Sequence, residues 1–240
     1  MKNWLYLEIY IQRILFWFMS TALLVLTLNE IDGMRQIMPN IKKEWVDEIV
    51  IVDGGSTDGT VNEAKKMGLN LIHQKNRGHG GAIITGVNST KSDNIIIFGP
   101  DGNHDPNEIL ILKEKIEEGY DQAIISRFSK TSVNLDAGWL DSFGNKMFTK
   151  LANIFFQGNL TDALNESRAI TRKAMSELEF DALGLDSTFQ MTIRGLKLKQ
   201  KIIEIPGNEG ERIGGERKIN SFRTGALLGR RLLKELTTKK

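Results

Sequence analysis

Residues 48–60 read Glu-Ile-Val-Ile-Val-Asp-Gly-Gly-Ser-Thr-Asp-Gly-Thr, an aliphatic run that ends at Asp53 and continues into a glycine-rich loop. A continuous aliphatic run of this length is typical of a strand buried on both faces, as in parallel sheets. A carboxylate at the tip of such a strand can accept hydrogen bonds from a ligand, and glycines let the backbone approach that ligand. A purely structural role is also open, because Ser56 or Asp58 can cap a helix that begins at Thr60.

The same alternation of aliphatic runs and helical spacing extends outward from this stretch. Further strands are expected at residues 22–28, 70–74, 94–98 and 121–126, and helices at 31–39, 60–67, 80–90 and 107–118. Buried strands that alternate with helices favour a single α/β domain, with a mostly parallel central sheet and helices on both faces. Ligands bind at the carboxyl ends of the strands in that architecture.

The composition narrows the class of protein. The chain has 240 residues, of which 26% are charged and 40% hydrophobic, and this mix indicates a folded globular protein rather than a disordered, collagen-like or polytopic membrane protein. It contains no cysteine, which excludes disulfides, thiolate metal clusters and a cysteine nucleophile. The net charge of +2 is too small for a surface that grips nucleic acid, so no nucleic-acid partner is expected.

Two more polar loops follow expected strands. Residues 99–106 read Gly-Pro-Asp-Gly-Asn-His-Asp-Pro, and Pro106 stands where a calcium-binding EF-hand needs glycine. What remains is Asp101, a carboxylate able to hold a divalent cation that also binds a diphosphate. Residues 76–82 form a basic, glycine-rich turn that resembles a phosphate cradle but lacks the Lys-Ser/Thr of a P-loop. The three histidines share no metal-ligand spacing and are expected to be loop or surface residues.

Seven segments together carry a family resemblance. LTLNEIDGM, IVDGGSTDGT, NRGHGGAIITG, FGPDGNHDP, SRF, LTDALNESRA and ERIGGERK occur in this order over about residues 20–225. In order and spacing they resemble the glycosyltransferase 2 family of the GT-A (nucleotide-diphospho-sugar transferase) fold. They are most similar to the branch of polyprenyl-phosphate hexosyltransferases, of the dolichol-phosphate mannose or undecaprenyl-phosphate glucose type.

The resemblance implies roles on the side of the sugar donor. Nucleotide-sugar-binding residues would be Asn29, Glu30, Asp53, Arg77, Gly78 and Asp101. Asp101 and Asn103 would also bind Mg²⁺ or Mn²⁺ as the cofactor. Arg212, Gly214, Gly215 and Lys218 match a segment that closes over the diphosphate.

It also implies roles on the acceptor side. Ser126, Arg127 and Arg168 would contact the acceptor, and Asp162 would lie beside the sugar. The catalytic residues would then be Asp101, Arg127, Asp162, Arg212 and Lys218. A lipid-phosphate acceptor is already ionised and needs only positioning, whereas a sugar hydroxyl needs a general base, for which Asp162 and Asp105 are the candidates.

The chain departs from the family pattern at two positions. The acidic loop of the family usually reads Asp-x-Asp, but here Gly99 replaces the first acid, and Gly54 stands where many relatives have a second aspartate after Asp53. A single carboxylate should hold a metal more weakly unless the diphosphate and Asn103 or Asp105 complete its coordination shell.

The function that the resemblance implies is that of an inverting, metal-dependent hexosyltransferase that uses a nucleoside diphosphate sugar. A catalytically inert sugar-nucleotide-binding relative is the alternative.

Both ends of the chain have unusual compositions. Residues 1–18 hold six of the 18 aromatic side chains, and residues 211–240 carry a net charge of +6 with an amphipathic helical pattern. We expect an N-terminal extension (1–18), a glycosyltransferase domain (19–225, with a nucleotide-sugar half at 19–105 and an acceptor half at 106–225) and a basic tail (226–240). The extension is either an interfacial helix or a segment before a natural start at Met19. A cytoplasmic enzyme of polysaccharide biosynthesis, bound peripherally to the inner face of the membrane, is expected.

Overall fold

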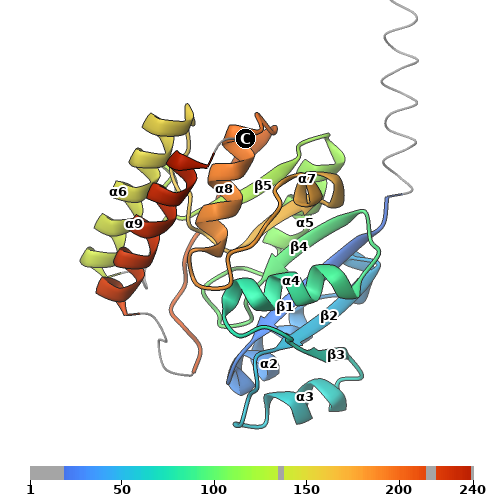
Figure 1. Ribbon diagram of the computed structural model, residues 1–240. Coiled ribbons are helices and arrows are strands. Elements are labelled where there is room, and N and C mark those ends of the chain that lie inside the picture. Colours follow the sequence, from blue (N-terminus) through green and yellow to red (C-terminus); the bar gives the residue numbers. More distant parts are fainter. Residues whose placement is uncertain (1–18, 135–137, 215–219, 239–240) are drawn as a thin grey trace, which may run out of the picture.

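The computed structural model describes residues 19–134, 138–214 and 220–238. These residues form a single domain around a seven-stranded sheet of order β3-β2-β1-β4-β6-β5-β7 (Figure 1). The strands are β1 (Thr21–Thr27), β2 (Glu48–Asp53), β3 (Asn70–His73), β4 (Asn94–Phe98), β5 (Gln122–Ser126), β6 (Arg168–Thr171) and β7 (Ile202–Pro206). The helices are α2 (Ile31–Gln36), α3 (Thr60–Lys66), α4 (His79–Ser89), α5 (Glu108–Glu117), α6 (Trp139–Phe156), α7 (Arg172–Glu177), α8 (Ser187–Lys197) and α9 (Ser221–Thr237), with short 3-10 helices at Met38–Asn40 and Lys43–Trp45.

The centre of the sheet is parallel and buried on both faces. β1 pairs in parallel with β2 and with β4, so that Val25 lies opposite both Ile51 and Phe98. Successive side chains of a strand point to opposite faces. Leu23 therefore packs into the hydrophobic cluster under α2 and α5, while Leu24 packs into the cluster under α4. This is why the strands have no polar side and appear in the sequence as unbroken aliphatic runs.

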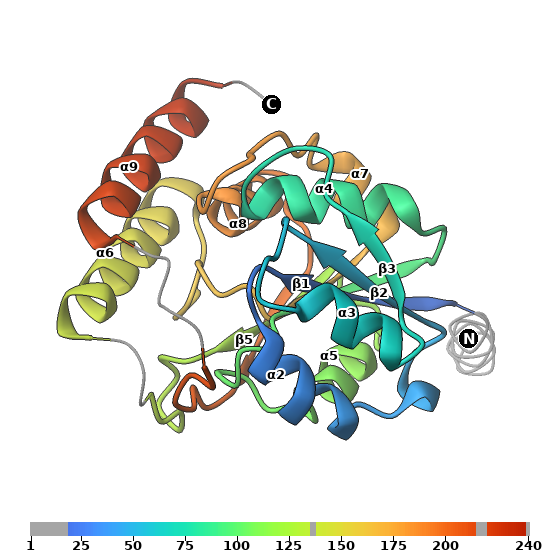
Figure 2. The ribbon, with the colours of Figure 1, turned by 90° about the horizontal axis from the view of Figure 1, so that it is seen from below.

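The helices form a layer on each face of the sheet and a further group outside one layer. Helices α2, α3 and α5 cover one face, and α4, α7 and α8 cover the other. Helices α6 and α9 pack on the outside of α8 (Figure 2). A third hydrophobic cluster joins them, in which the rings of Phe148 and Phe189 meet edge to face at 5.8 Å beside Leu228 and Leu232.

The expected fold class is confirmed, with one reversal of strand direction. All the strands and helices expected between residues 22 and 126 are present, and their ends lie within a few residues of the expected positions. Strand β6 was not expected, and it runs antiparallel to β4 and β5. It has four residues and begins with Arg168, so it lacks the aliphatic run that identified its neighbours.

The basic tail is part of the domain rather than a separate segment. Helix α9 runs through the expected boundary at residue 225, and its Leu228 and Leu232 are buried against α6 and α8. Arg231 Nε lies 2.7 Å from Asp186 Oδ2, and Lys234 Nζ lies 2.8 Å from Asp181 Oδ2. These cations are therefore neutralised within the domain. The expected extension, residues 1–18, lies outside the described residues, and no described helix is long and apolar enough to span a bilayer.

Candidate active site

A cavity of about 850 Å³ opens at the carboxyl ends of the parallel strands. Its wall comes from the segments that follow β1, β2, β4, β5 and β7, from the loop before β6, from the start of α4, and from α6 and α9. The residues predicted from the sequence that line it are Glu30, Gly78, Asp101, Asn103, Arg127 and Arg212. The topology therefore brings together the ends of strands that are far apart in the chain, as expected for a sheet of this type.

Asp101 and Arg212 form the charged centre of one side of the cavity. Arg212 Nη1 lies 2.7 Å from Asp101 Oδ2, and the same guanidinium also pairs with Glu30. The backbone reinforces this contact, because Ile213 N donates to the carbonyl oxygen of Asp101 at 2.7 Å. Burial and the nearby negative charge of Glu166 raise the pKa of Asp101, and Arg212 opposes that rise. The described part of the expected closing segment thus lies directly on the acidic loop, while Gly215 and Lys218 lie outside the described residues.

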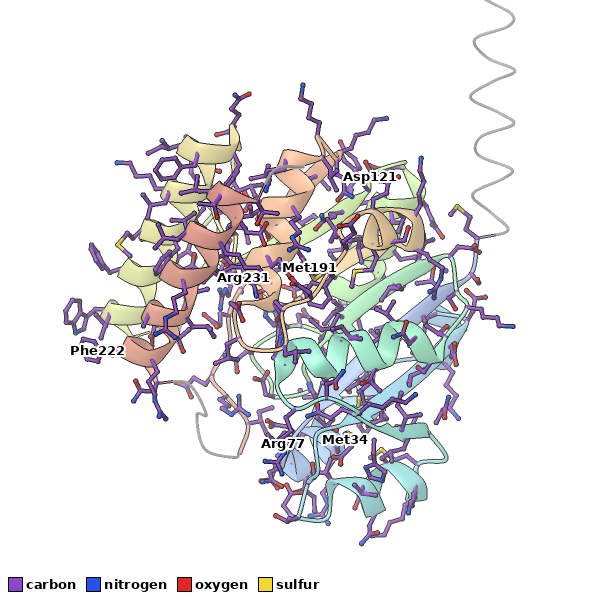
Figure 3. The ribbon with its side chains drawn as sticks, viewed as in Figure 1. Met34, Arg77, Asp121, Met191, Phe222 and Arg231 are labelled. Atoms are coloured by element: carbon purple, nitrogen blue, oxygen red, sulfur yellow. The ribbon has the colours of Figure 1, made fainter. Side chains whose placement is uncertain are left out.

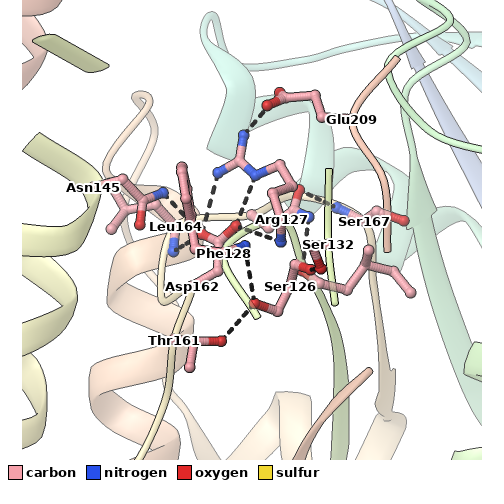
Figure 4. A network of polar contacts seen from close by, with 12 residues as sticks. Ser126, Arg127, Phe128, Ser132, Asn145, Thr161, Asp162, Leu164, Ser167 and Glu209 are labelled. Carbon is pink, nitrogen blue, oxygen red and sulfur yellow. Dashed lines mark hydrogen bonds and ion pairs between the residues drawn. The ribbon is translucent and has the colours of Figure 1, made fainter. Parts of the chain in front are cut away.

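Arg127 is the centre of a second charged cluster on the cavity wall (Figure 4). Its Nε and Nη2 donate to the two carboxylate oxygens of Asp162 at 2.7 and 3.1 Å, and its Nη1 donates to Glu209 Oε1 at 3.1 Å. Asn145 Nδ2 also donates to Asp162, at 2.8 Å. Although burial by itself would raise the pKa of Asp162, the charge of Arg127 and the hydrogen bonds that it donates lower it.

Asn103 connects the two clusters. Its Nδ2 donates to Glu209 Oε1 at 3.3 Å, the same oxygen that accepts from Arg127. Asn103 N in turn donates to Asp101 Oδ1 at 3.2 Å. Asn103 and the carboxylate of Glu209 thus link the acidic loop to Arg127.

A third group, not predicted from the sequence, joins α4 to the loop before β6. His79 Nε2 lies 2.7 Å from Glu166 Oε2, and His79 Nδ1 lies 2.7 Å from Ser187 Oγ. Burial alone would raise the pKa of Glu166, but the hydrogen bond and charge of His79 lower it to about 2. Glu166 is therefore ionised at neutral pH and faces the same cavity as Asp101.

Three residues predicted to bind the nucleotide do not line the cavity. Asp53 is fully buried, and its Oδ2 accepts from Gly55 N at 2.8 Å and from Ser56 N at 3.1 Å, so it stabilises its own turn. Asn29 Oδ1 accepts from the backbone of the same loop, Thr57 N, at 2.8 Å. Arg77, labelled in Figure 3, is exposed and does not line the cavity, although its neighbour Gly78 does. Their role in binding a nucleoside stays a prediction.

The residues predicted for the acceptor side are also held by contacts within the domain, and their role stays a prediction. Arg168 was expected to contact the acceptor, but it is fully buried in β6 and donates to the carbonyl oxygen of Asn165 and to Thr192 Oγ1. Burial lowers its pKa to about 10. Ser126 is also fully buried, with its Oγ 2.5 Å from Thr161 Oγ1. Asp162 does not line the cavity, so its contact with the site passes through Arg127.

The glycine-rich turn before α4 serves packing rather than an open phosphate cradle. Gly80 N and Gly81 N donate to the carbonyl oxygens of Gly184 and Leu183, at 3.3 and 3.2 Å. A Cβ atom on Gly80 would lie 1.9 Å from the carbonyl oxygen of Ala182. The glycines therefore allow the loop at residues 182–184 to approach the start of the helix, and its carbonyls occupy two of the amides that a phosphate would need.

The three histidines were expected to be loop or surface residues, and they have different environments: His73 ends β3, His104 lies in the loop after β4, and His79 begins α4. His73 has an exposed side chain, but His104 is buried against Glu108, and His79 contacts Glu166 within the site. His79 and Glu166 both lie in segments already recognised as family motifs, which is the only sequence signal that could have found them. Glu209 has no such signal, because its role depends on the proximity of Arg127 and Asn103.

The side of the cavity formed by α6 and α9 is mostly nonpolar, although Asp141, Asn145, Ser221 and Thr224 also line it. Phe143, Met147 and Phe148 of α6 face it together with Phe222 and Leu228 of α9. Several of these side chains are also exposed to solvent, Phe222 by 81% and Phe143 by 61%. Figure 3 shows Phe222 at the edge of the molecule. The cavity thus has a charged end at the strand tips and a nonpolar end that continues onto the surface.

Comparisons with known proteins identify the family of this chain. The family model "Glycosyl transferase family 2" matches residues 23–179. The chain is 32% identical over 209 residues to the uncharacterized protein MJ1222 of Methanocaldococcus jannaschii, covering 81% of this chain and 85% of that protein. It is 27% identical over 220 residues to the dolichyl-phosphate hexose transferase of Haloferax volcanii, covering 90% and 94%.

Solved structures show the same fold. Glucosyl-3-phosphoglycerate synthase from Mycobacterium tuberculosis, in complex with Mn²⁺, UDP-glucose and phosphoglyceric acid, superimposes with a TM-score of 0.76 at 18% identity, covering 95% of this chain and 84% of that one. At this level of identity the likeness concerns the fold alone. The seven-stranded sheet with helices on both faces is thus a GT-A fold.

The chain belongs to glycosyl transferase family 2. Its resemblance to polyprenyl-phosphate sugar transferases is confirmed by relatives such as the dolichyl-phosphate hexose transferase.

Proposed function

We propose that this chain transfers a hexosyl group from a nucleoside diphosphate sugar to polyprenyl phosphate, with inversion at the anomeric carbon. One observation carries the proposal: a single cavity holds the acidic loop with Arg212, the side chain of Arg127 and a nonpolar wall. The acidic loop with Arg212 suits a diphosphate leaving group. Arg127 suits an acceptor phosphate, and the nonpolar wall suits an isoprenoid chain. A glycan intermediate of the cell envelope is the other acceptor that the same chemistry admits.

The donor side suits a divalent cation. Asp101 and Asn103 offer the carboxylate and amide oxygens that Mg²⁺ and Mn²⁺ prefer, and few protein ligands are needed when a diphosphate supplies the rest. The guanidinium of Arg212, 2.7 Å from Asp101, shows that positive charge is accommodated at this position. When bound, the cation would neutralise charge that develops on the departing diphosphate. Arg212, once released from Asp101, is placed to neutralise the same phosphates.

The acceptor side suits an anion that is already ionised. Arg127 lines the cavity. Its Nη1 donates one N–H to Glu209, and its Nη2 donates one N–H to Asp162, so each of these nitrogens retains a second N–H. A phosphate can accept from these donors while the carboxylates hold the guanidinium plane fixed. Arg127 would therefore position the acceptor oxygen for attack without taking a proton from it.

Neither candidate general base is suitably placed for a hydroxyl acceptor. Both oxygens of Asp162 accept hydrogen bonds from Arg127, and the pKa of Asp162 is lowered, which makes it a weak base. Asp105 is exposed, does not line the cavity, and accepts from Asn107 N at 2.9 Å at the start of α5. This arrangement favours the phosphate acceptor.

The nonpolar wall suits a lipid chain and peripheral contact with a membrane. Trp139 and Phe143 lie one turn apart on α6 and are 81% and 61% exposed, and Phe222 of α9 is 81% exposed. Aromatic side chains favour the membrane interface, and Arg223 and Arg230 of α9 are exposed as well. In this proposal the enzyme works at the cytoplasmic face of the membrane, where the phosphate end of the acceptor enters the cavity along the nonpolar wall.

The test is a transfer assay with a matched pair of variants in one loop. Asp101→Asn should lower transfer to polyprenyl phosphate by about 100-fold or more, because charge stabilisation at the leaving group is lost. Asp105→Asn makes the same chemical change on a side chain outside the cavity and should keep activity. Loss of activity in Asp105→Asn would instead favour a hydroxyl acceptor with Asp105 as base. Donor binding without any turnover in the wild type would support the inert alternative.

A further inference from the structure

The position of the missing acid in the acidic loop is filled by another carboxylate. Gly99 occupies the first position of the loop, where the family usually has aspartate. A Cβ atom built on Gly99 would lie 2.5 Å from Glu166 Oε1 and 3.9 Å from Asp101 Oδ1. Real Cβ atoms do not approach other atoms to 2.5 Å. The carboxylate of Glu166 therefore stands where a side chain at residue 99 would begin.

Glu166 is held in this place from both sides. Its Oε2 is hydrogen-bonded to His79 Nε2 at 2.7 Å, and His79 is itself fixed by Ser187 through Nδ1. The chain around Glu166 is anchored to β5, because Asn165 Nδ2 donates to the carbonyl oxygen of Ile125 at 2.7 Å. His79 thus holds one oxygen of the carboxylate, and the other is directed toward Gly99 and Asp101.

We propose that Glu166 supplies the carboxylate that residue 99 lacks, and that Glu166 and Asp101 together bind the divalent cation. This inference rests on the proposed use of a cation by the enzyme. The donor set fits it, because hard cations take carboxylate oxygens and usually need one or two from the protein. The ligand would come from the loop before β6 instead of the loop after β4, at the same point in the cavity.

The same geometry sets the two acids in competition for one place. An aspartate at residue 99 would displace the carboxylate of Glu166 from its position beside Gly99, whereas glycine leaves that position to Glu166. The absence of the first acid is then an exchange of ligand position and does not indicate an inert relative.

Binding of MnCl₂ to the purified chain, with and without UDP, tests the inference by electron paramagnetic resonance of the free ion. Removing a residue that merely supports a ligand costs about 10- to 100-fold in metal affinity, so Glu166→Gln should raise the Mn²⁺ dissociation constant at least about tenfold. Glu114→Gln, the same change on an exposed side chain of α5, should leave it unchanged. Gly99→Asp alone should lower the melting temperature through the collision, and Gly99→Asp combined with Glu166→Ala should recover most of the lost Mn²⁺ affinity.

The outcomes separate this inference from the proposed function. Unchanged Mn²⁺ affinity in a folded Glu166→Gln variant, beside a wild type that binds Mn²⁺ and transfers sugar, would overturn the inference and leave the proposed function standing. No recovery in a folded double variant would also overturn it, since residue 99 and residue 166 would then not share a ligand position. A wild type that binds no Mn²⁺ in either condition would overturn the proposed use of a cation itself.

Discussion

Replacing Asp162 by asparagine should destabilise the domain strongly although the side chain keeps its size. Asp162 is fully buried and is held by Arg127 through Nε at 2.7 Å and Nη2 at 3.1 Å. The substitution leaves the guanidinium of Arg127, whose side chain is only 17% exposed, with Glu209 as its one charged partner among the described residues. Removing one partner of a buried ion pair costs about 3–5 kcal/mol, because the other charge remains desolvated.

The magnitude can be converted into a melting temperature. For domains of this size each kcal/mol corresponds to about 2–4 °C, so the expected decrease is about 6–20 °C. The lowered pKa of Asp162 fixes the sign of the pH dependence. Its contribution is fully present above the unfolded pKa of about 3.9 and is lost as the pH falls through the lower folded value. The difference between wild type and Asp162→Asn should therefore be largest near neutral pH and shrink in acid.

Scanning calorimetry at several pH values, with urea unfolding at neutral pH, measures both quantities. Arg35→Gln is the control, because the pair of Arg35 with Glu63 is at the surface, with the arginine 53% exposed, and should be worth less than about 1 kcal/mol. A double variant, Asp162→Asn with Arg127→Leu, should lose less than the sum of its single variants because the pair is removed together. A loss below about 1 kcal/mol for Asp162→Asn would refute the assignment of a strong buried pair.

Two other substitutions test how neighbouring segments support the site. Gly33→Ala would place a Cβ atom 1.8 Å from the carbonyl oxygen of Pro100, so it should cost about 1–3 kcal/mol and reduce transfer by displacing the acidic loop. Gly229→Ala in α9 is the control, because its new Cβ meets nothing within 4 Å, and it should reduce neither the stability nor the transfer rate. If calorimetry and transfer assays gave the same losses for Gly229→Ala as for Gly33→Ala, the explanation by collision would be contradicted. Glu235→Gln removes the charge of a buried carboxylate whose two oxygens each lie 3.1 Å from Arg194 Nε. It should lower the free energy needed to open α9 by about 3–5 kcal/mol. Amide hydrogen exchange measures how readily α9 opens. Protection of the α9 amides in Glu235→Gln equal to that in the wild type would argue against a stabilising role of the pair between Glu235 and Arg194.

The central strands could be predicted because burial on both faces leaves a direct trace in the sequence. The aliphatic runs of β1, β2 and β4 end at polar or glycine residues, which mark the edge where ligands bind. Strand β6 leaves no such trace, because its first residue, Arg168, is buried by tertiary contacts that local pattern does not reveal. Sequence also could not show that α9 packs on the domain, since an amphipathic pattern suits a membrane surface equally well.

The sequence predicted the site best at charged residues that directly follow a strand or lie in a recognised motif. Asp101, Arg127 and Arg212 line the cavity as expected. Asp53 and Ser126 lie at strand ends as expected, but only the fold decides that they point inward and stabilise turns. Glu166 was not predicted because its relation to Gly99 arises from two loops that are distant in the sequence.

The central claim is most directly tested by incubating the purified chain with a panel of nucleoside diphosphate sugars, Mn²⁺ and polyprenyl phosphate in detergent, and analysing the lipid fraction by mass spectrometry. We predict a hexosyl-phospho-polyprenol from at least one donor, formed only with the acceptor present and lost in Asp101→Asn. Donor binding or hydrolysis with no glycolipid from any donor would contradict the claim.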